Sequence, residues 1–169
     1  PAEGYKPGRD VPVVGFTDDR MPRKWLYAGP FPEHHEPLAT DEQRSSARPK
    51  PGQRLGVGKH RTDWQKLKEG KGLYKGRYSG GQTILELTGP HGVVTHTQSY
   101  YYTVLQNDKP RWVRVHAGHG GVEVYLGGVA LREGDVARLQ PGLYPWLATG
   151  PIGEMNPWGK SFAEPKLIE

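Results

Sequence analysis

The chain has 169 residues, a length at which one domain can bury a core of its own without cross-links. It contains no cysteine, which excludes disulfides, thiolate metal sites and cysteine nucleophiles. The formal net charge of +5 is compatible with anionic partners but selects none, and no apolar run approaches the ~20 residues of a membrane-spanning helix.

The N-terminal part of the chain is rich in turns. Residues 1–22 are expected to form an extended segment, in which Val11, Val13 and Val14, interrupted by Pro12, suggest an edge strand. Residues 24–28 predict a short strand that ends at the Gly-Pro-Phe-Pro sequence of residues 29–32.

A long polar region follows. Residues 33–81 are expected to be mostly loop, although residues 62–67 within them suit either one strand or a single helical turn. Residues 83–87 predict a further strand. Basic residues are frequent between Arg44 and Arg77, but acidic residues are interleaved and no nucleic-acid-binding motif is present. The composition therefore favours a solvated loop and no nucleic-acid partner.

The second half carries the clearest pattern. Runs rich in β-branched and aromatic residues alternate with turns of Gly, Asp, Asn and Pro. The runs are residues 100–106, 111–117, 122–135, 136–139 and 143–148. Their lengths and short connections predict an antiparallel β-sheet, and no helix longer than about two turns is expected in the chain.

Alternation within these runs assigns faces. In residues 111–117 the valines and Ala117 share one face, while Trp112, Arg114 and His116 share the other. In the next run Val122, Val124 and Leu126 are expected to be buried, opposite Glu123 and Tyr125. The Gly127-Gly128 pair suits a type I′ hairpin that would pair Tyr125-Leu126 with Val129-Ala130.

The end of the chain is expected to be irregular. Pro151, Pro157 and Pro165 exclude a helix over residues 149–169. The predicted organisation is an extended segment at residues 1–22, a β-domain at residues 23–148 and a Pro-rich tail at residues 149–169.

Several sequence features resemble a known family. They are Trp25, Gly29, Pro30 and Phe31 near the start; Val122, Val124, Tyr125, Leu126 and Gly128 in a V-x-V-Y-L-x-G pattern; and Leu139 with Gly142 before the last strand. Together they look like the jelly-roll accessory domains of secreted bacterial glycoside hydrolases, polysaccharide lyases and related envelope proteins. The resemblance implies an all-β, antiparallel two-sheet β-sandwich with a non-catalytic role and a secreted or cell-envelope location.

Two departures from the family pattern are visible. The hairpin lacks the usual Asn, and Pro145 interrupts the final strand, so that residues 156–159 are expected to cover the closing edge. Because the chain begins with Pro rather than Met, it is expected to derive from a longer precursor.

Aromatic residues are the leading candidates for ligand contact. Trp112 and Tyr125 are expected on the outward face of adjacent strands, with Trp146 and Trp158 near the tail, and Arg114 or Glu123 is expected to bond sugar hydroxyls. The alternative is that residues 33–81 or the tail cover this face, which would make these residues a second core.

Catalytic and metal-binding patterns are weaker. His116 and His119, followed by Glu123, suggest a cupin-type metal centre, but cupins separate their first two histidines by one residue rather than two. No Gly-x-Ser-x-Gly elbow and no complete phosphate-binding loop occur. We therefore expect no enzyme activity, no metal and no cofactor, with the cupin-type enzyme as an alternative.

The sequence thus favours a non-catalytic, exported β-sandwich module that binds glycan or packs against a partner domain. A structural subunit that assembles with itself or with an envelope complex through its ends is the alternative.

Overall fold

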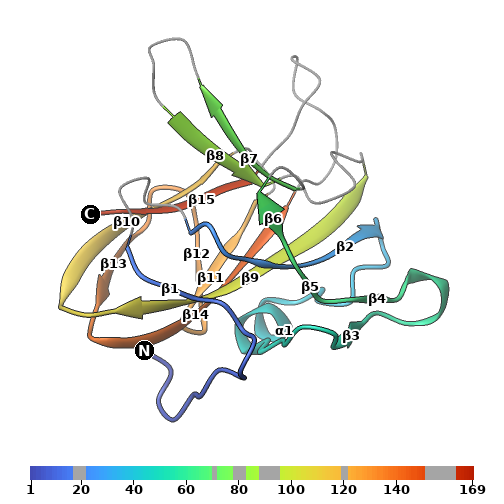
Figure 1. The fold of residues 1–169 in the computed structure, drawn as a ribbon, viewed down its shortest axis with the longest axis horizontal. Helices are drawn as coiled ribbons and strands as arrows, with labels where there is room; N and C mark the ends of the chain where they lie inside the picture. Colours follow the sequence, from blue (N-terminus) through green and yellow to red (C-terminus); the bar gives the residue numbers. More distant parts are fainter. Residues whose placement is uncertain (17–21, 70–71, 78–82, 88–95, 119–121, 151–162) are drawn as a thin grey trace.

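The computed structural model describes the chain except for residues 17–21, 70–71, 78–82, 88–95, 119–121 and 151–162 (Figure 1). The described part is mostly β-structure, and its helices are α1 (Asp41–Ser46) and the 3-10 turn η1 (Gly58–His60). The all-β prediction is therefore confirmed. Trp158, His119 and the predicted cover at residues 156–159 lie outside the described residues.

The described strands form two large, mainly antiparallel sheets and one small ribbon. The seven-stranded sheet runs in the order β12 (Val129–Leu131), β11 (Val124–Leu126), β14 (Gly142–Gly150), β9 (Thr97–Asn107), β2 (Leu26–Pro32) and β5 (Gln65–Lys66), with β1 (Val13–Val14) parallel to β9. The six-stranded sheet runs in the order β13 (Val136–Leu139), β10 (Arg111–Gly118), β15 (Ala163–Ile168), β8 (Thr83–Leu87), β7 (Gly72–Arg77) and β6 (Lys68–Glu69). The ribbon pairs β3 (Arg54–Leu55) with β4 (Thr62–Asp63).

The inner core draws its side chains from strands of both large sheets. Trp25, Tyr101, Leu105, Val124 and Trp146 come from the seven-stranded sheet or its edge. The six-stranded sheet adds Val113, Val115, Ala117, Leu139 and Leu167. Val113, Val115, Val124 and Leu126 are buried and the partly buried Val122 packs against them, so the predicted core face of these runs is confirmed, whereas Tyr125 on the opposite face is buried as well.

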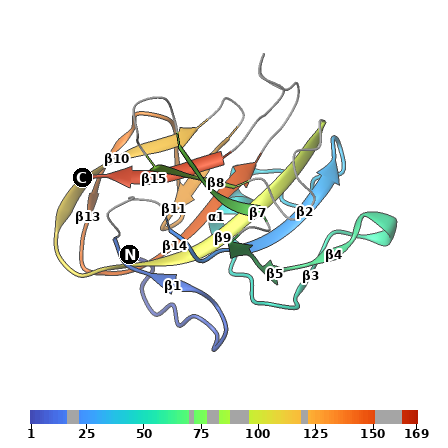
Figure 2. The same ribbon diagram turned by 45° about the horizontal axis from the view of Figure 1, so that its top comes forward.

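A second core covers the opposite face of the seven-stranded sheet. Its strand residues are Leu26, Ala28, Phe31, Tyr100, Tyr102, Val104, Tyr125 and Leu147. Val11 and Trp64 join them from outside the sheet, and Tyr5, Leu38, Ala47 and Leu55 pack against the cluster. Figure 2 shows β9 as the long strand between β14 and β2. Side chains on both of its faces are consequently buried.

The hairpin and the last predicted strand show how local sequence is accommodated. Leu126 pairs with Val129 and Tyr125 with Ala130 across Gly127 and Gly128, which have φ of 60° and 86°, so the predicted hairpin is confirmed. The strand β14 continues through Pro145. The Pro145 carbonyl accepts a hydrogen bond from the Gly127 amide at 2.8 Å, so the Pro145 nitrogen also faces the end of β11 and not β9. Its missing N–H therefore removes no bond from the ladder between β14 and β9.

Three predictions are corrected. The strand at residues 24–28 is instead Leu26–Pro32, and residues 62–67 form the two short strands β4 and β5 rather than one element. The tail is not irregular over Ala163–Ile168, because β15 lies between β10 and β8 inside the six-stranded sheet. The strand predicted at residues 83–87 is confirmed, and of the edge strand predicted over Val11, Val13 and Val14 the structure has Val13–Val14.

Candidate ligand-binding site

The predicted ligand-binding residues do not form one surface. Trp112 is 60% exposed, whereas Tyr125 is 2% and Trp146 is 1% exposed. Trp112 and Tyr125 also belong to different sheets, because β10 pairs with β13 and β15 while β11 pairs with β12 and β14. The expectation that they lie on adjacent strands is wrong.

Trp146 lies inside the inner core. Its ring meets that of Trp25 edge-on, with centroids 5.4 Å apart and an interplanar angle of 70°. Such pairs stabilise a core through their geometry as well as their area. Trp146 therefore offers no ring face to a surface ligand in this conformation.

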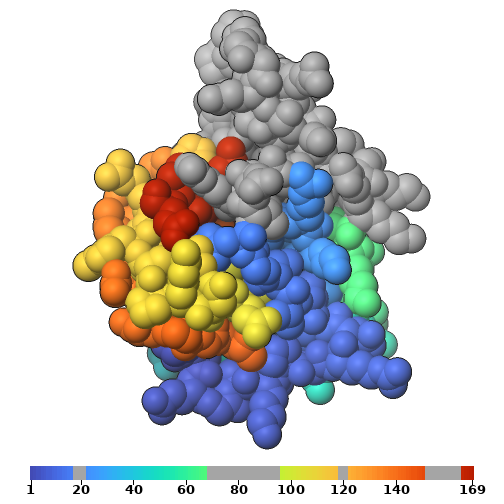
Figure 3. All heavy atoms as spheres, turned by 60° about the vertical axis from the view of Figure 1, so that its left-hand side comes forward, coloured from blue at the N-terminus to red at the C-terminus, as the bar shows by residue number. Residues whose placement is uncertain are grey.

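Trp112 remains available on the outer face of the six-stranded sheet. It belongs to a shallow hollow of about 350 Å³ lined by Trp112, Val113, Arg114, Val136, Ile168 and Glu169. Figure 3 shows this side of the molecule, where the red C-terminal residues adjoin yellow residues of the segment that includes β10. The hollow thus retains Trp112 and Arg114 of the predicted site and adds residues from β13 and the end of the chain.

Strand register defines which side chains share this outer face. Arg138 is opposite Trp112, and both Val136 and Ile168 are opposite Arg114. The Arg138 guanidinium lies 5.4 Å from the centroid of the Trp112 ring, a cation–π contact. We call the surface formed by Trp112, Arg114, Val136, Arg138, Lys166 and Ile168 the Trp112 face.

His116 follows Trp112 and Arg114 on the outward side of β10. Its Nδ1 is 2.8 Å from Glu133 Oε1, and the other Glu133 oxygen accepts a hydrogen bond from the Ala117 amide. Within the described ranges no three His, Cys, Asp or Glu side chains are grouped to hold a metal ion. His116 is placed here as the partner of Glu133.

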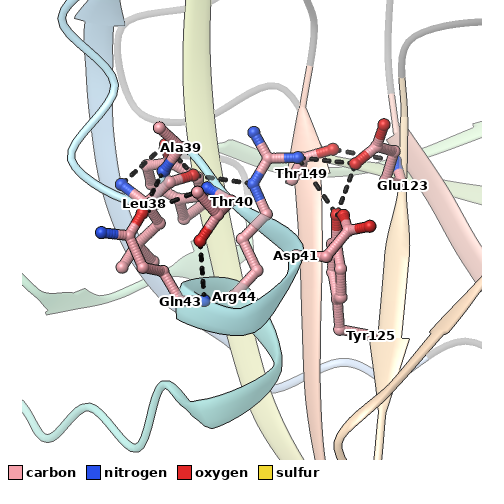
Figure 4. Close-up of polar contacts among 10 residues, drawn as sticks. Leu38, Ala39, Thr40, Asp41, Gln43, Arg44, Glu123, Tyr125 and Thr149 are labelled. Carbon is pink, nitrogen blue, oxygen red and sulfur yellow. Dashed lines mark hydrogen bonds and ion pairs between the residues drawn. The ribbon is translucent and has the colours of Figure 1, made fainter.

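Tyr125 is enclosed by the region predicted to be loop. Figure 4 shows α1 against β11, with Arg44 and Asp41 directed at the Tyr125 hydroxyl. Arg44 donates from Nη1 to Glu123 Oε2 at 2.6 Å and to the Tyr125 hydroxyl at 3.1 Å. The hydroxyl lies 2.7 Å from Asp41 Oδ1 and 2.5 Å from Glu123 Oε2. We call these four residues the Arg44 cluster.

The Arg44 cluster connects α1 to the seven-stranded sheet through hydrogen bonds and an ion pair. Burial first, then the hydrogen bond to Glu123, raises the pKa of Tyr125 well above its usual range, so the hydroxyl stays protonated. Its single proton can be donated to one carboxylate at a time, and Arg44 neutralises Glu123. Because the polar groups of the cluster are paired with one another, it fastens α1 to the sheet and leaves no open ring for a ligand.

Local sequence explains why α1 forms at this point. Thr40 accepts a hydrogen bond from the Gln43 amide at 3.1 Å, and the Gln43 side chain accepts one from the Thr40 amide at 3.1 Å. Asp41 and Glu42 occupy the first turn, where acidic side chains are favoured. The Thr-x-x-Gln capping box was the sequence signal that could have predicted this short helix.

A histidine-lined pocket occupies another part of the surface. It has a volume of about 520 Å³, and His34, His35, Glu36 and His60 are among its lining residues. The rings of His35 and His60 have centroids 4.5 Å apart. Loss of solvent contact, followed by the charges of His35 and Lys59, lowers the pKa of His60.

Comparison of the chain with family models, curated proteins and solved structures found no significant match. Among the described helices, none has the length and apolar character needed to cross a membrane. The Trp112 face is therefore the candidate site on the strength of its own geometry.

Proposed function

We propose that this chain is a non-catalytic β-sandwich module that binds glycan through the Trp112 face. The observation that carries the proposal is Trp112 itself, a tryptophan 60% exposed in a hollow that also contains a cationic side chain, Arg114. Apolar C–H faces of sugar rings stack on such an indole, while a neighbouring guanidinium bonds hydroxyl or acidic groups.

The architecture supports the same proposal. A core shared by a seven-stranded and a six-stranded sheet, both mainly antiparallel, suits a sandwich of the jelly-roll type. This is the fold implied by the resemblance to accessory domains of secreted carbohydrate-active enzymes. Under this proposal the chain is exported and places a glycan near a separate catalytic domain or anchors a protein to the envelope.

The proposal is tested by binding to a panel of polysaccharides, measured by retardation in affinity gels. Trp112→Ala should lower the affinity for the bound glycan about tenfold, and Trp112→Phe, which keeps an aromatic face, should lose much less. Val57→Ala changes an apolar residue that is 84% exposed and does not line the Trp112 hollow. It is the matched control and should leave retardation unchanged. Retardation that is identical in Trp112→Ala and the native chain would reject the site.

A second candidate function is favoured by the apolar part of the same face. Val136 is 54% exposed, and Ile168 lies half-buried beside Arg114. A partner domain or another copy of the chain could cover Trp112, Val136 and Ile168 together. Light scattering distinguishes this candidate, because an oligomer that Val136→Asp dissociates would support packing, whereas a monomer would leave the face open for glycan.

A further inference from the structure

We infer that the ligand of the Trp112 face is a polyanionic glycan, a chain whose sugar units carry carboxylate or sulfate groups. The inference rests on the proposed function and specifies its ligand class. It is drawn from the positions of three cationic side chains that strand register places on one face: Arg138, Arg114 and Lys166.

These cations form a diagonal row across three neighbouring strands. Arg138 of β13 is opposite Trp112, Arg114 lies two residues further along β10, and Lys166 of β15 is opposite His116, two residues further again. With strands about 4.8 Å apart and a rise of about 3.3 Å per residue, successive Cα atoms in the row are about 8 Å apart. A regular spacing of this kind matches a polymer with regularly repeated charges.

Two carboxylates beside the row are occupied by other groups. Glu133 contacts His116 and the Ala117 amide, and Glu169 lies 3.2 Å from the buried Arg111 guanidinium. Within the described part of the chain, Arg114 and Arg138 have no ion pair with an acidic side chain. Arg114 and Arg138 therefore keep a positive charge that an anionic ligand would neutralise.

The aromatic content of the face favours sugar over nucleic acid. Among the Trp, Tyr and Phe side chains that the structure describes, Trp112 is the one that is exposed. Single-stranded nucleic acids are bound on successive aromatic platforms, one for each stacked base, whereas a glycan needs only one ring to position a chain whose charges are then read by guanidinium groups. Arg138 stacks on one side of Trp112, which also prepares a cation beside the sugar-binding ring.

The test uses the full chain and isothermal titration with four probes of similar length. The probes are an oligogalacturonate, a heparin oligosaccharide, a neutral cello-oligosaccharide and oligo(dT). We expect one or both acidic glycans to bind with an affinity that falls steeply with salt. Oligogalacturonate carries carboxylates alone and heparin carries sulfates as well, so binding of heparin but not of oligogalacturonate would identify sulfate as the required group. Arg114→Gln with Arg138→Gln should lower that affinity at least tenfold and flatten the salt dependence.

The matched control is Arg54→Gln with Lys59→Gln. It removes the same charge from exposed residues of the polar region of residues 33–81, which carries β3 and η1. It should leave the affinity within about twofold. An equal loss in the control would overturn the site, and tighter binding of oligo(dT) than of either glycan would overturn the ligand class. Binding of the neutral glycan alone, lost in Trp112→Ala, would overturn this inference but uphold the proposed function; no binding to any glycan would overturn both.

Discussion

Three consecutive tyrosines show how strongly the surroundings differentiate identical residues. Tyr100, Tyr101 and Tyr102 are all fully buried on β9, but alternate between the two cores. The Tyr100 hydroxyl bonds the backbone of Leu38, and that of Tyr102 lies 2.8 Å from the Tyr5 hydroxyl. The Tyr101 hydroxyl has no hydrogen-bond partner among the described residues. The three hydroxyls therefore contribute differently to stability.

Removing two buried hydroxyls should have opposite effects. Tyr101→Phe deletes an unpaired polar atom and should leave the free energy of unfolding unchanged or raise it by up to about 1 kcal/mol. Tyr125→Phe removes the hydroxyl at the centre of the Arg44 cluster and should lower the free energy by about 1–3 kcal/mol. Urea unfolding of both variants measures the difference. A loss in Tyr101→Phe as large as in Tyr125→Phe would show that the Tyr101 hydroxyl is bonded.

At the scale of the element, β15 matters most because it comes last in the chain and yet lies inside a sheet. It pairs with β10 on one side and β8 on the other, and its Leu167 is buried in the inner core. A strand in this position contributes ladder hydrogen bonds to two neighbours as well as apolar area. The six-stranded sheet is consequently incomplete until the last residues of the chain have joined it.

Truncation should therefore destroy the fold. A chain that ends at residue 162 should lose its cooperative thermal transition, since β10 and β8 would each lose their shared neighbour. Leu167→Ala, a smaller change, should lower the free energy of unfolding by about 2–5 kcal/mol. Circular dichroism during heating is the measurement. Lys166→Ala on the opposite face of β15 is the control for Leu167→Ala and should cost much less.

The elements that sequence predicts well are those with one dominant local signal. Strict alternation identified the buried valines of β10, and the Gly127-Gly128 pair identified the hairpin. By contrast β15 was missed because Pro165 argued against regular structure. The register between β10 and β15 shifts just where Pro165 lies, between His116 and Gly118, and such irregularities are where a strand tolerates proline.

The candidate site was only half predictable for a different reason. Alternation places Trp112 and Tyr125 on the non-core side of their own strands, but it does not say which strands pair or what covers a face. The polar region of residues 33–81, which carries α1, covers Tyr125. The strand β10 belongs to the six-stranded sheet, whereas β11 belongs to the seven-stranded sheet. The first fact depends on contacts between residues about 80 positions apart in the sequence, and the second on pairings between strands that are not consecutive in the chain. No local pattern records either.

At the scale of the whole molecule, buried tyrosines link stability to alkaline pH. Burial raises the pKa of Tyr27 to about 12, partly offset by the hydrogen bond to Ser99, and burial likewise raises that of Tyr100 to about 12. Burial also raises the pKa values of Tyr101 and Tyr102. In the unfolded chain a tyrosine titrates near pH 10. The native state therefore retains protons that the unfolded state has already released.

The free energy of unfolding should fall between about pH 10 and pH 12. Each tyrosine whose pKa is raised contributes its stabilisation in full below pH 10, and each lowers the free energy by about 1.4 kcal/mol per pH unit above it. Urea unfolding across this range, with tyrosinate absorbance as a second readout, measures the slope. In Tyr27→Phe the slope should be shallower by about one such contribution, whereas an unchanged slope would show that Tyr27 does not titrate with unfolding.

The burial of β9 on both faces has a consequence for folding accuracy. In a sheet with one solvent-exposed face, a shift of the strand register by one residue turns the apolar side chains toward water, which is unfavourable. In β9 the same shift would only exchange the side chains that face the two cores, so exposure to solvent does not disfavour the wrong register. Specific contacts must select the register instead. A side chain at Gly150 would overlap the Tyr101 ring. At the other end of β9 the Asn107 side-chain amide donates hydrogen bonds to the carbonyls of Lys109 and Gln140. Correct alignment of the central strand thus depends on a few close contacts at its two ends.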